Sequence, residues 1–236
     1  MPYRDMKTRL LPLVLIGLAG LAACGRPLTQ NETTVLQAMQ GDDLDTSRIR
    51  FHDGLWAGKV TFQRPIRPRL TCMERIWPPS QGETVTTSPG AMTLFNRVFY
   101  REDLYRKDFM SEWPERVDLL DAMLFAHESV HVWQWQNRAR TGYTPLKAAF
   151  EHGVSEDPYL FDPERDGRFL DHGYEQQGAI VEEYVCCHLL DPEAPRTARL
   201  RTMISEEMPL EGIEEALDVH EVLLPWRGVQ PKGICR

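Results

Sequence analysis

The sequence is 236 residues long, and its 35 Asp and Glu residues outnumber its 27 Lys and Arg residues, which gives a net charge of −8. That negative charge argues against a nucleic-acid partner and against adhesion to anionic lipid by charge alone. Beyond the first 24 residues, the chain is long enough for one domain with a full hydrophobic core.

The first 23 residues have the pattern of an export signal. Three basic residues precede residues 10–21, a mainly apolar run that is too short for a stable membrane span. The run ends in Leu-Ala-Ala-Cys24, which resembles the lipobox of bacterial lipoproteins. The resemblance implies that Cys24 is lipidated and that the protein is exported and anchored in the cell envelope, at the outer membrane or its periplasmic face. The alternative is an ordinary secretory signal beside a fortuitous cysteine.

Residues 24–45 are predicted to form a polar, lipid-anchored tether with a short helical pattern at 33–39, and residues 46–236 the folded domain. Short strands are expected at 49–52 and 59–62, where apolar and β-branched residues precede turn residues.

The stretch 63–90 contains five of the 17 prolines, and it predicts an irregular covering loop. Residues 92–100 are rich in aromatic and β-branched residues and form the best strand candidate in the chain. Two interpretations stay open for this strand. It could be an edge strand beside the functional site, where free backbone groups can bind an extended chain. It could equally be a core strand.

The central motif is HESVH at residues 127–131, an HExxH pattern. Residues 117–140 lack Pro and Gly, and their apolar residues recur at three- and four-residue spacings, which predicts one long helix. In a helix, His127 and His131 are one turn apart, so both imidazoles can reach one zinc ion while Glu128 stands beside its open side. Glu128 could then act as general base toward a zinc-activated water.

A third ligand is expected from a second helix, predicted at 174–190 and ended by an Asp-Pro pair. Glu175 is the predicted ligand, because the small residue Ala179 one turn away would let the two helices approach a shared metal. Glu182 lies on the same face and remains a competitor. The neighbouring Glu183 is expected to be solvated.

A metal-dependent hydrolase also needs a group that stabilises the negative charge of a tetrahedral intermediate. Tyr174 and His172 are the candidates we favour, because they lie beside the second helix. Tyr143 and Tyr159, which lie in another loop-rich stretch at residues 143–171, are further candidates. None of them has a diagnostic spacing, so a purely structural role is the alternative for each. Further helices are expected at residues 146–152, 196–208 and 212–223.

Four cysteines follow the signal. They are Cys72, Cys186, Cys187 and Cys235. An even number in an exported protein suggests two disulfides, with three possible connectivities. Because adjacent cysteines are strained partners for each other, we expect one bridge from each of Cys186 and Cys187, to Cys72 and Cys235. A cysteine zinc site is the alternative, although no CxxC spacing supports it.

The runs HESVHVWQWQ and EQQGAIVEEY resemble the gluzincin branch of the zinc metallopeptidases. They are also similar to uncharacterised bacterial HELTHVWQ-like proteins that are often labelled as Vgr- or Rhs-related. The likeness covers roughly residues 90–185. It implies an α+β, mostly helical, zincin-like metallopeptidase domain with a small sheet and a C-terminal helical lobe. It also implies zinc bound by His127, His131 and Glu175, with Glu128 as base. Gly178 departs from the usual alanine.

These features predict a zinc metallopeptidase of the cell envelope that hydrolyses a peptide or protein substrate. The rival hypothesis is a non-catalytic envelope lipoprotein with a structural or vestigial metal site, in which His172, His188 or Glu182 would close the coordination sphere. A third possibility keeps hydrolysis but moves it to an amide bond of cell-wall peptides.

Overall fold

The computed structural model describes residues 25–165 and 167–236, so the predicted export signal and Cys24, the predicted lipidation site, lie outside the described residues. Within them the chain is an α+β domain with small sheets, as predicted. Its helices are α2 (Gln30–Gln40), α3 (Cys72–Arg75), α4 (Leu119–Gln136), α5 (Arg138–Thr141), α6 (Pro145–Val154), α7 (Tyr174–Leu190), α8 (Pro195–Ile204) and α9 (Ile213–Leu217). Its strands are β1 (Arg50–Asp53), β2 (Phe62–Pro65), β3 (Thr84–Thr87), β4 (Ala91–Leu94), β5 (Arg97–Tyr100), β6 (Arg116–Asp118) and β7 (Glu221–Leu223).

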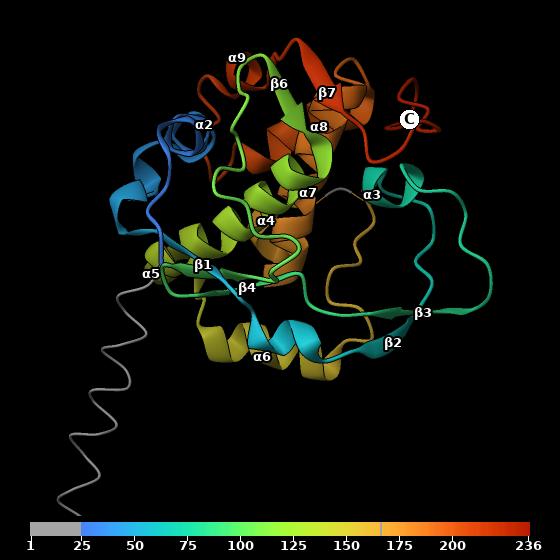
Figure 1. The fold of residues 1–236 in the computed structure, drawn as a ribbon, viewed down its shortest axis with the longest axis horizontal. Coiled ribbons are helices and arrows are strands. Elements are labelled where there is room, and N and C mark those ends of the chain that lie inside the picture. Colours follow the sequence, from blue (N-terminus) through green and yellow to red (C-terminus); the bar gives the residue numbers. More distant parts are fainter. Residues whose placement is uncertain (1–24, 166) are drawn as a thin grey trace, which may run out of the picture.

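Two long helices, α4 and α7, pack along each other in the middle of the domain (Figure 1). The Asp118 side chain begins α4 by accepting a hydrogen bond from the amide of Asp121. The helix ends at Asn137, earlier than predicted. Gly142, in the left-handed conformation, ends the short α5 instead. The bounds of α7 are those predicted from the sequence.

The strand predicted at 92–100 is two strands. β4 and β5 pair antiparallel with Leu94 opposite Arg97, so Phe95 and the following asparagine form a two-residue turn. Phe95 takes a positive φ of 60°, which such turns require, and its ring packs against Trp135 with centroids 4.6 Å apart. The sheet order is β1-β5-β4, so β4 is an edge strand, and it contacts α4.

The predicted tether is part of the folded domain. Its residues 30–40 form α2, which Thr29 and Glu32 begin with a capping box. Glu32 is buried and forms an ion pair with Arg26, with N and O 2.7 Å apart. The apolar side chains of the helix lie on one face and enter the core, which is why this segment is ordered; they are Val35, Leu36 and Met39.

Three further predictions about elements need correction. The covering loop at 63–90 contains α3 and a β2–β3 hairpin, and the strand predicted at 59–62 begins only at residue 62. The helix predicted at 212–223 stops at Leu217, and the chain continues as β7, which pairs in parallel with β6. The open edge of β6 offers backbone hydrogen bonds to residues 221–223, and this tertiary pairing overrides the helical pattern.

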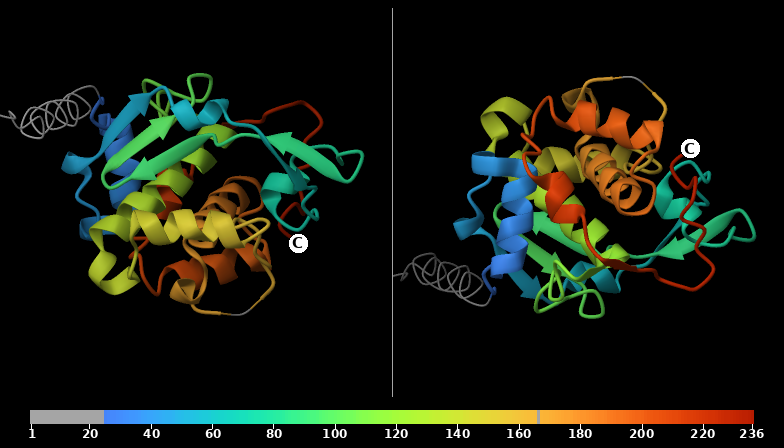
Figure 2. Two further views of the ribbon diagram at one scale, coloured as in Figure 1. Left: turned by 90° about the horizontal axis from the view of Figure 1, so that it is seen from below. Right: turned by 90° about the horizontal axis from the view of Figure 1, so that it is seen from above.

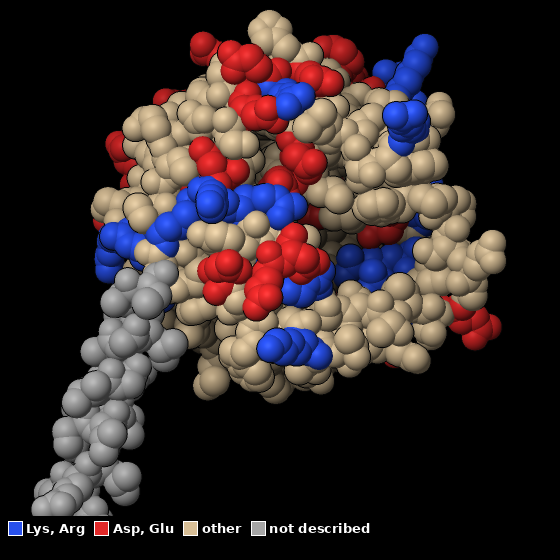
Figure 3. Space-filling view, viewed as in Figure 1, with Lys and Arg blue, Asp and Glu red and all other residues tan. Residues whose placement is uncertain are grey.

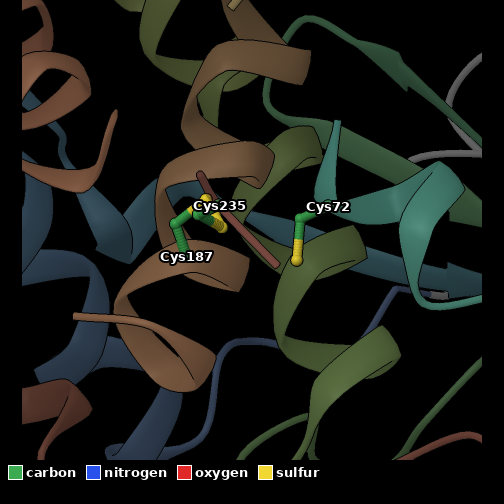
Figure 4. A group of neighbouring side chains, drawn as sticks. All are labelled: Cys72, Cys187 and Cys235. Carbon is green, nitrogen blue, oxygen red and sulfur yellow. A yellow bond between two sulfur atoms is a disulfide. The ribbon is translucent and has the colours of Figure 1, made fainter. Parts of the chain in front are cut away.

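Both predicted disulfides are confirmed. Cys72 pairs with Cys186, and Cys187 pairs with Cys235, so two consecutive residues of α7 bind α3 and the C-terminal segment. The sulfur atoms of Cys72, Cys187 and Cys235 lie within 4.8 Å of one another. Figure 4 draws these three side chains. Because these sulfurs are in disulfides, they are not thiolate ligands, and the alternative of a cysteine zinc site is wrong.

Glu183 is buried rather than solvated. It accepts a hydrogen bond from the amide of Cys72 at 2.6 Å and forms an ion pair with Arg196 at 2.9 Å. Burial raises its pKa to about 7, although the Cys72 amide and the Arg196 guanidinium both lower it. The disulfide beside it brings α3 over this side of α7, a contact that helical periodicity cannot indicate.

The surface carries charges of both signs. Figure 3 shows Lys and Arg side chains interspersed with Asp and Glu on the face seen in Figure 1, so this face has no single-sign field. Among the residues that the structure describes, no helix is both long and apolar enough to cross a bilayer.

Candidate metal centre

The structure brings the three predicted ligands together between α4 and α7. His127 and His131 project from α4, and Glu175 projects from the first turn of α7. Their ligand atoms, the two Nε2 nitrogens and Oε2 of Glu175, form a triangle with sides of 3.2, 3.3 and 3.4 Å. All three residues are buried, with 5 to 7% of their surface exposed.

The triangle fits a tetrahedral zinc ion. Nitrogen and carboxylate ligands about 2.0–2.1 Å from such an ion lie about 3.3–3.4 Å from one another. The three observed separations agree with this value to within about 0.2 Å. The donor set of two imidazoles and one carboxylate is also one that zinc prefers in catalytic sites, so these residues fit the ion.

Each imidazole is oriented by a partner on its other nitrogen. His127 Nδ1 lies 2.9 Å from Oε2 of Glu182, and His131 Nδ1 lies 2.9 Å from Oε1 of Gln134. Both partners are acceptors, so each Nδ1 carries a hydrogen, and Nε2 is the nitrogen that would lose its proton to bind a metal. Glu182, the predicted competitor of Glu175, therefore lies outside the triangle and orients His127.

Gly178 lets the two helices approach at this level. A Cβ atom placed on Gly178 would lie only 2.8 Å from Cε1 and Nε2 of His127. We predicted the close approach at Ala179, which is partly buried and one residue away. The departure from alanine at position 178 is therefore the feature that accommodates the His127 ring.

The charge balance of the cluster favours a cation. Burial lowers the pKa of His127, but hydrogen bonds with Glu175 and Glu182 outweigh it and raise the pKa to about 10. For Glu175, burial raises the pKa, but the charge of His131 and hydrogen bonds from three histidines take it well below its usual value. The carboxylates thus stabilise positive charge at the point where the three ligand atoms meet.

Glu128 lies beside the triangle, one residue after His127, and is 5% exposed. Its Oε2 accepts a hydrogen bond of 2.7 Å from the hydroxyl of Thr93 on the edge strand β4. Sequence reasoning missed Thr93. The only signal was a hydroxyl residue within the strand candidate.

His152 was missed as well. It belongs to α6, and its Nε2 lies 2.9 Å from Oε1 of Glu175. The hydrogen bond with Glu175 raises the pKa of His152. No sequence spacing relates His152 to the HExxH helix, because His152 lies in a separate helix within a loop-rich stretch.

The four candidates for stabilising negative charge are placed differently. Tyr159 has its ring centroid 5.8 Å from that of His127, and Tyr143 has its centroid 6.5 Å from that of His131. The two favoured candidates are not brought to the triangle: Tyr174 donates its hydroxyl hydrogen to the Gly142 carbonyl at 3.0 Å. The ring of His172 lies beside Gly167, and that of His188 beside Tyr184; neither belongs to the metal-binding group.

Known proteins with similar sequence and structure belong to type VI secretion spike proteins by their names. No protein-family profile matches the chain. The chain is similar to the type VI secretion system spike protein VgrG2b of Pseudomonas aeruginosa, with 24% identity over 163 residues, which are 69% of this chain and 13% of the spike protein. Among solved structures, the effector domain of Pseudomonas aeruginosa VgrG2b matches with a TM-score of 0.47 and 24% identity, covering 77% of this chain and 82% of that domain.

The sequence match overturns two predictions. The assignment to the gluzincin metallopeptidases is wrong, because the sequence similarity is to a secretion-system spike protein. The predicted function, a metallopeptidase or a non-catalytic lipoprotein of the cell envelope, is wrong on the same finding. The physical reason is that HExxH specifies how one helix can bind a metal and does not specify the surrounding fold, the bond cleaved or the compartment.

Proposed function

We propose that this chain is a zinc-dependent hydrolase that acts as an effector of type VI secretion. The single observation that supports hydrolysis is the triangle of ligand atoms from His127, His131 and Glu175, with the buried Glu128 beside it. The secretion role is supported by the similarity to the VgrG2b spike protein. Since the chain spans only 13% of that protein, its assembly role is not part of the proposal.

His127, His131 and Glu175 would bind the zinc ion. When bound, zinc supplies Lewis acidity, which makes a water more acidic and polarises the bond to be cleaved. Glu182 and Gln134 keep both imidazoles in the tautomer that presents Nε2 to the ion.

Glu128 would move the proton. Its carboxylate would take a proton from the attacking water and return it to the leaving group. The hydrogen bond from Thr93 fixes one oxygen of Glu128, so the orientation of the carboxylate is set before substrate binds. Burial of Glu128 excludes competing water, which strengthens each of these interactions.

Tyr143 and Tyr159 are the residues we propose to stabilise developing negative charge, in place of Tyr174 and His172. Burial and the charges of Glu175 and Glu128 raise the pKa of both hydroxyls. Both tyrosines therefore stay protonated at neutral pH and can donate hydrogen bonds. We further propose that α4, α7 and the edge strand β4 form a zincin-like arrangement around the site.

The proposal is tested by producing residues 1–236 in a bacterial host. We expect the wild type to slow growth and to contain one zinc per chain. Glu128→Gln should retain zinc and lose growth inhibition, because an amide cannot accept the proton, whereas His127→Ala should lose both. Glu211→Gln, at an exposed glutamate, is the matched control and should behave as wild type.

Two results would contradict the proposal. Growth inhibition by Glu128→Gln equal to wild type at equal protein level would exclude the proton-transfer role. A wild-type chain that binds no zinc would exclude the metal site itself.

A further inference from the structure

The helix α6 packs against the start of α7 and therefore lies beside the metal site. Figure 2 (left) shows α6 and the β1-β5-β4 sheet in front of the central helices α4 and α7. Thr144 begins α6 by accepting a hydrogen bond from the amide of Lys147, and Lys147 donates to the carbonyl of Gly142 at 2.7 Å. These bonds fix the N-terminal end of α6 to the chain that leaves the HExxH helix.

Two consecutive residues near the end of α6 contact α7. The carboxylate of Glu151 accepts hydrogen bonds from the amides of Tyr174, at 3.0 Å, and Glu175, at 3.3 Å. Amides in the first turn of a helix have no partner within the helix, so Glu151 satisfies two that would otherwise lack one. The next residue, His152, contacts the Glu175 side chain. Thus α6 fixes both the backbone and the carboxylate of the third ligand.

The hydrogen bond between His152 and Glu175 has a defined direction. An ionised carboxylate only accepts, so His152 donates from Nε2 to Oε1 of Glu175 over 2.9 Å. The other oxygen, Oε2, is the one that lies 3.2 and 3.4 Å from the two imidazole nitrogens of α4. The two oxygens of Glu175 therefore have different neighbours.

We propose that His152 is a positioning residue, which occupies Oε1 of Glu175 so that only Oε2 is available to the metal. The terminal torsion of a glutamate is broad and roughly two-fold, so an unrestrained carboxylate can turn and present both oxygens. The hydrogen bond from His152 removes that freedom. This inference rests on the proposed function, because it assumes that His127, His131 and Glu175 bind the ion.

The test measures metal binding by the full-length chain without any substrate. The protein is stripped with a chelator and titrated with zinc against a competing chelator, and separately with cobalt, whose visible absorption weakens as its ligand number rises. Removing a residue that orients a ligand lowers metal affinity by about 10- to 100-fold in known sites. We expect a loss of that size in His152→Ala, together with a weaker cobalt absorption.

Three further variants separate positioning from folding. His152→Gln keeps a donor and should restore most of the zinc affinity, while His152→Met keeps bulk without a donor and should resemble His152→Ala. His220→Ala, at an exposed histidine outside the site, should match wild type.

Wild-type zinc affinity and an unchanged cobalt spectrum in His152→Ala or His152→Met would overturn the positioning role while leaving the metal site intact. A wild-type chain that binds neither metal would instead overturn the proposed function. The two failures are therefore distinguishable.

Discussion

Each imidazole of the HExxH motif depends for its orientation on a residue outside the motif. Glu182 bonds to His127 from the third turn of α7, and Gln134 bonds to His131 from the next turn of α4. Gln134 also donates to Gln177 on α7 at 2.9 Å. A ligand whose rotamer is fixed in this way loses little freedom when it binds a metal, which favours affinity.

A buried histidine outside the site predicts that the fold loses stability in acid. His52 is stacked on Phe99 with ring centroids 4.5 Å apart, and its Nε2 is buried without a hydrogen-bond partner. Burial, with a smaller effect of the Arg97 charge, lowers its pKa below 6.5. The unfolded chain binds this proton more readily than the folded chain. The contribution of His52 to the free energy of unfolding is therefore complete above pH 6.5 and is lost as the pH falls, by at most about 1.4 kcal/mol per pH unit.

Chemical denaturation of the wild type and of His52→Asn at pH 7.5 and pH 5 measures this effect. We expect the wild type to lose more stability between the two pH values than the variant, in which residue 52 does not titrate. The exposed His220→Ala serves as the control and should follow wild type. An equal loss in wild type and His52→Asn would show that His52 does not contribute.

Among the site residues, those that are close to one another in the sequence could be predicted from it. His127, Glu128 and His131 follow from helical spacing alone, and Glu175 follows from its place at the start of a second helix. Thr93 and His152 could not be predicted, because they reach the site through tertiary contacts from a strand and a separate helix. The burial of Glu183 was missed for the same reason.

The approach of α7 to α4 is the element-scale feature on which the metal site depends. Because a Cβ on Gly178 would lie 2.8 Å from the His127 ring, Gly178→Ala must push the helices apart or turn the ring. We expect about 1–3 kcal/mol of destabilisation from overpacking. Zinc affinity, measured against a competing chelator, should fall at least about tenfold because an orienting contact is lost.

Gly153→Ala in α6 is the matched control, since a Cβ there would meet no atom within 4 Å. Replacing a helical glycine by alanine at an open position should instead stabilise by about 0.5–1 kcal/mol. Wild-type zinc affinity and stability in Gly178→Ala would show that the approach of α7 to α4 does not require a glycine at position 178.

Elements with strong periodicity were the predictable ones. The bounds of α7 were predicted correctly, and α4 was predicted apart from its ends. The hairpin of β4 and β5 was missed because its turn uses Phe95 at positive φ, a residue that gives no turn signal. β7 was missed because its pairing with β6 joins segments about a hundred residues apart.

For the whole molecule, two disulfides and α6 surround the helix pair that bears the site. The disulfides bind α3 and the C-terminal segment to α7, and α6 contacts the other end of α7 through Glu151 and His152. The first turn of α7, which carries Glu175, is thus bound to α6, and its last turns are bound to the disulfides. Such bracing favours a preorganised site.

The α+β class and the meeting of the three candidate ligands were predicted from the sequence, whereas the assignment to the gluzincins was wrong. The motif residues form only the candidate metal site, whereas fold, substrate and partners depend on the rest of the chain. The similarity to the VgrG2b spike protein extends over 69% of the chain, far beyond the HExxH motif. It is therefore a better guide than the motif to the proteins that this chain resembles.

Zinc K-edge X-ray absorption of the full-length chain tests the central claim most directly, because it identifies the atoms bound to the metal. We predict one zinc per chain, with nitrogen and oxygen ligands at about 2.0–2.1 Å, including the scattering of two imidazoles. Sulfur ligands at about 2.3 Å, or zinc with fewer than two imidazoles, would contradict binding by His127, His131 and Glu175.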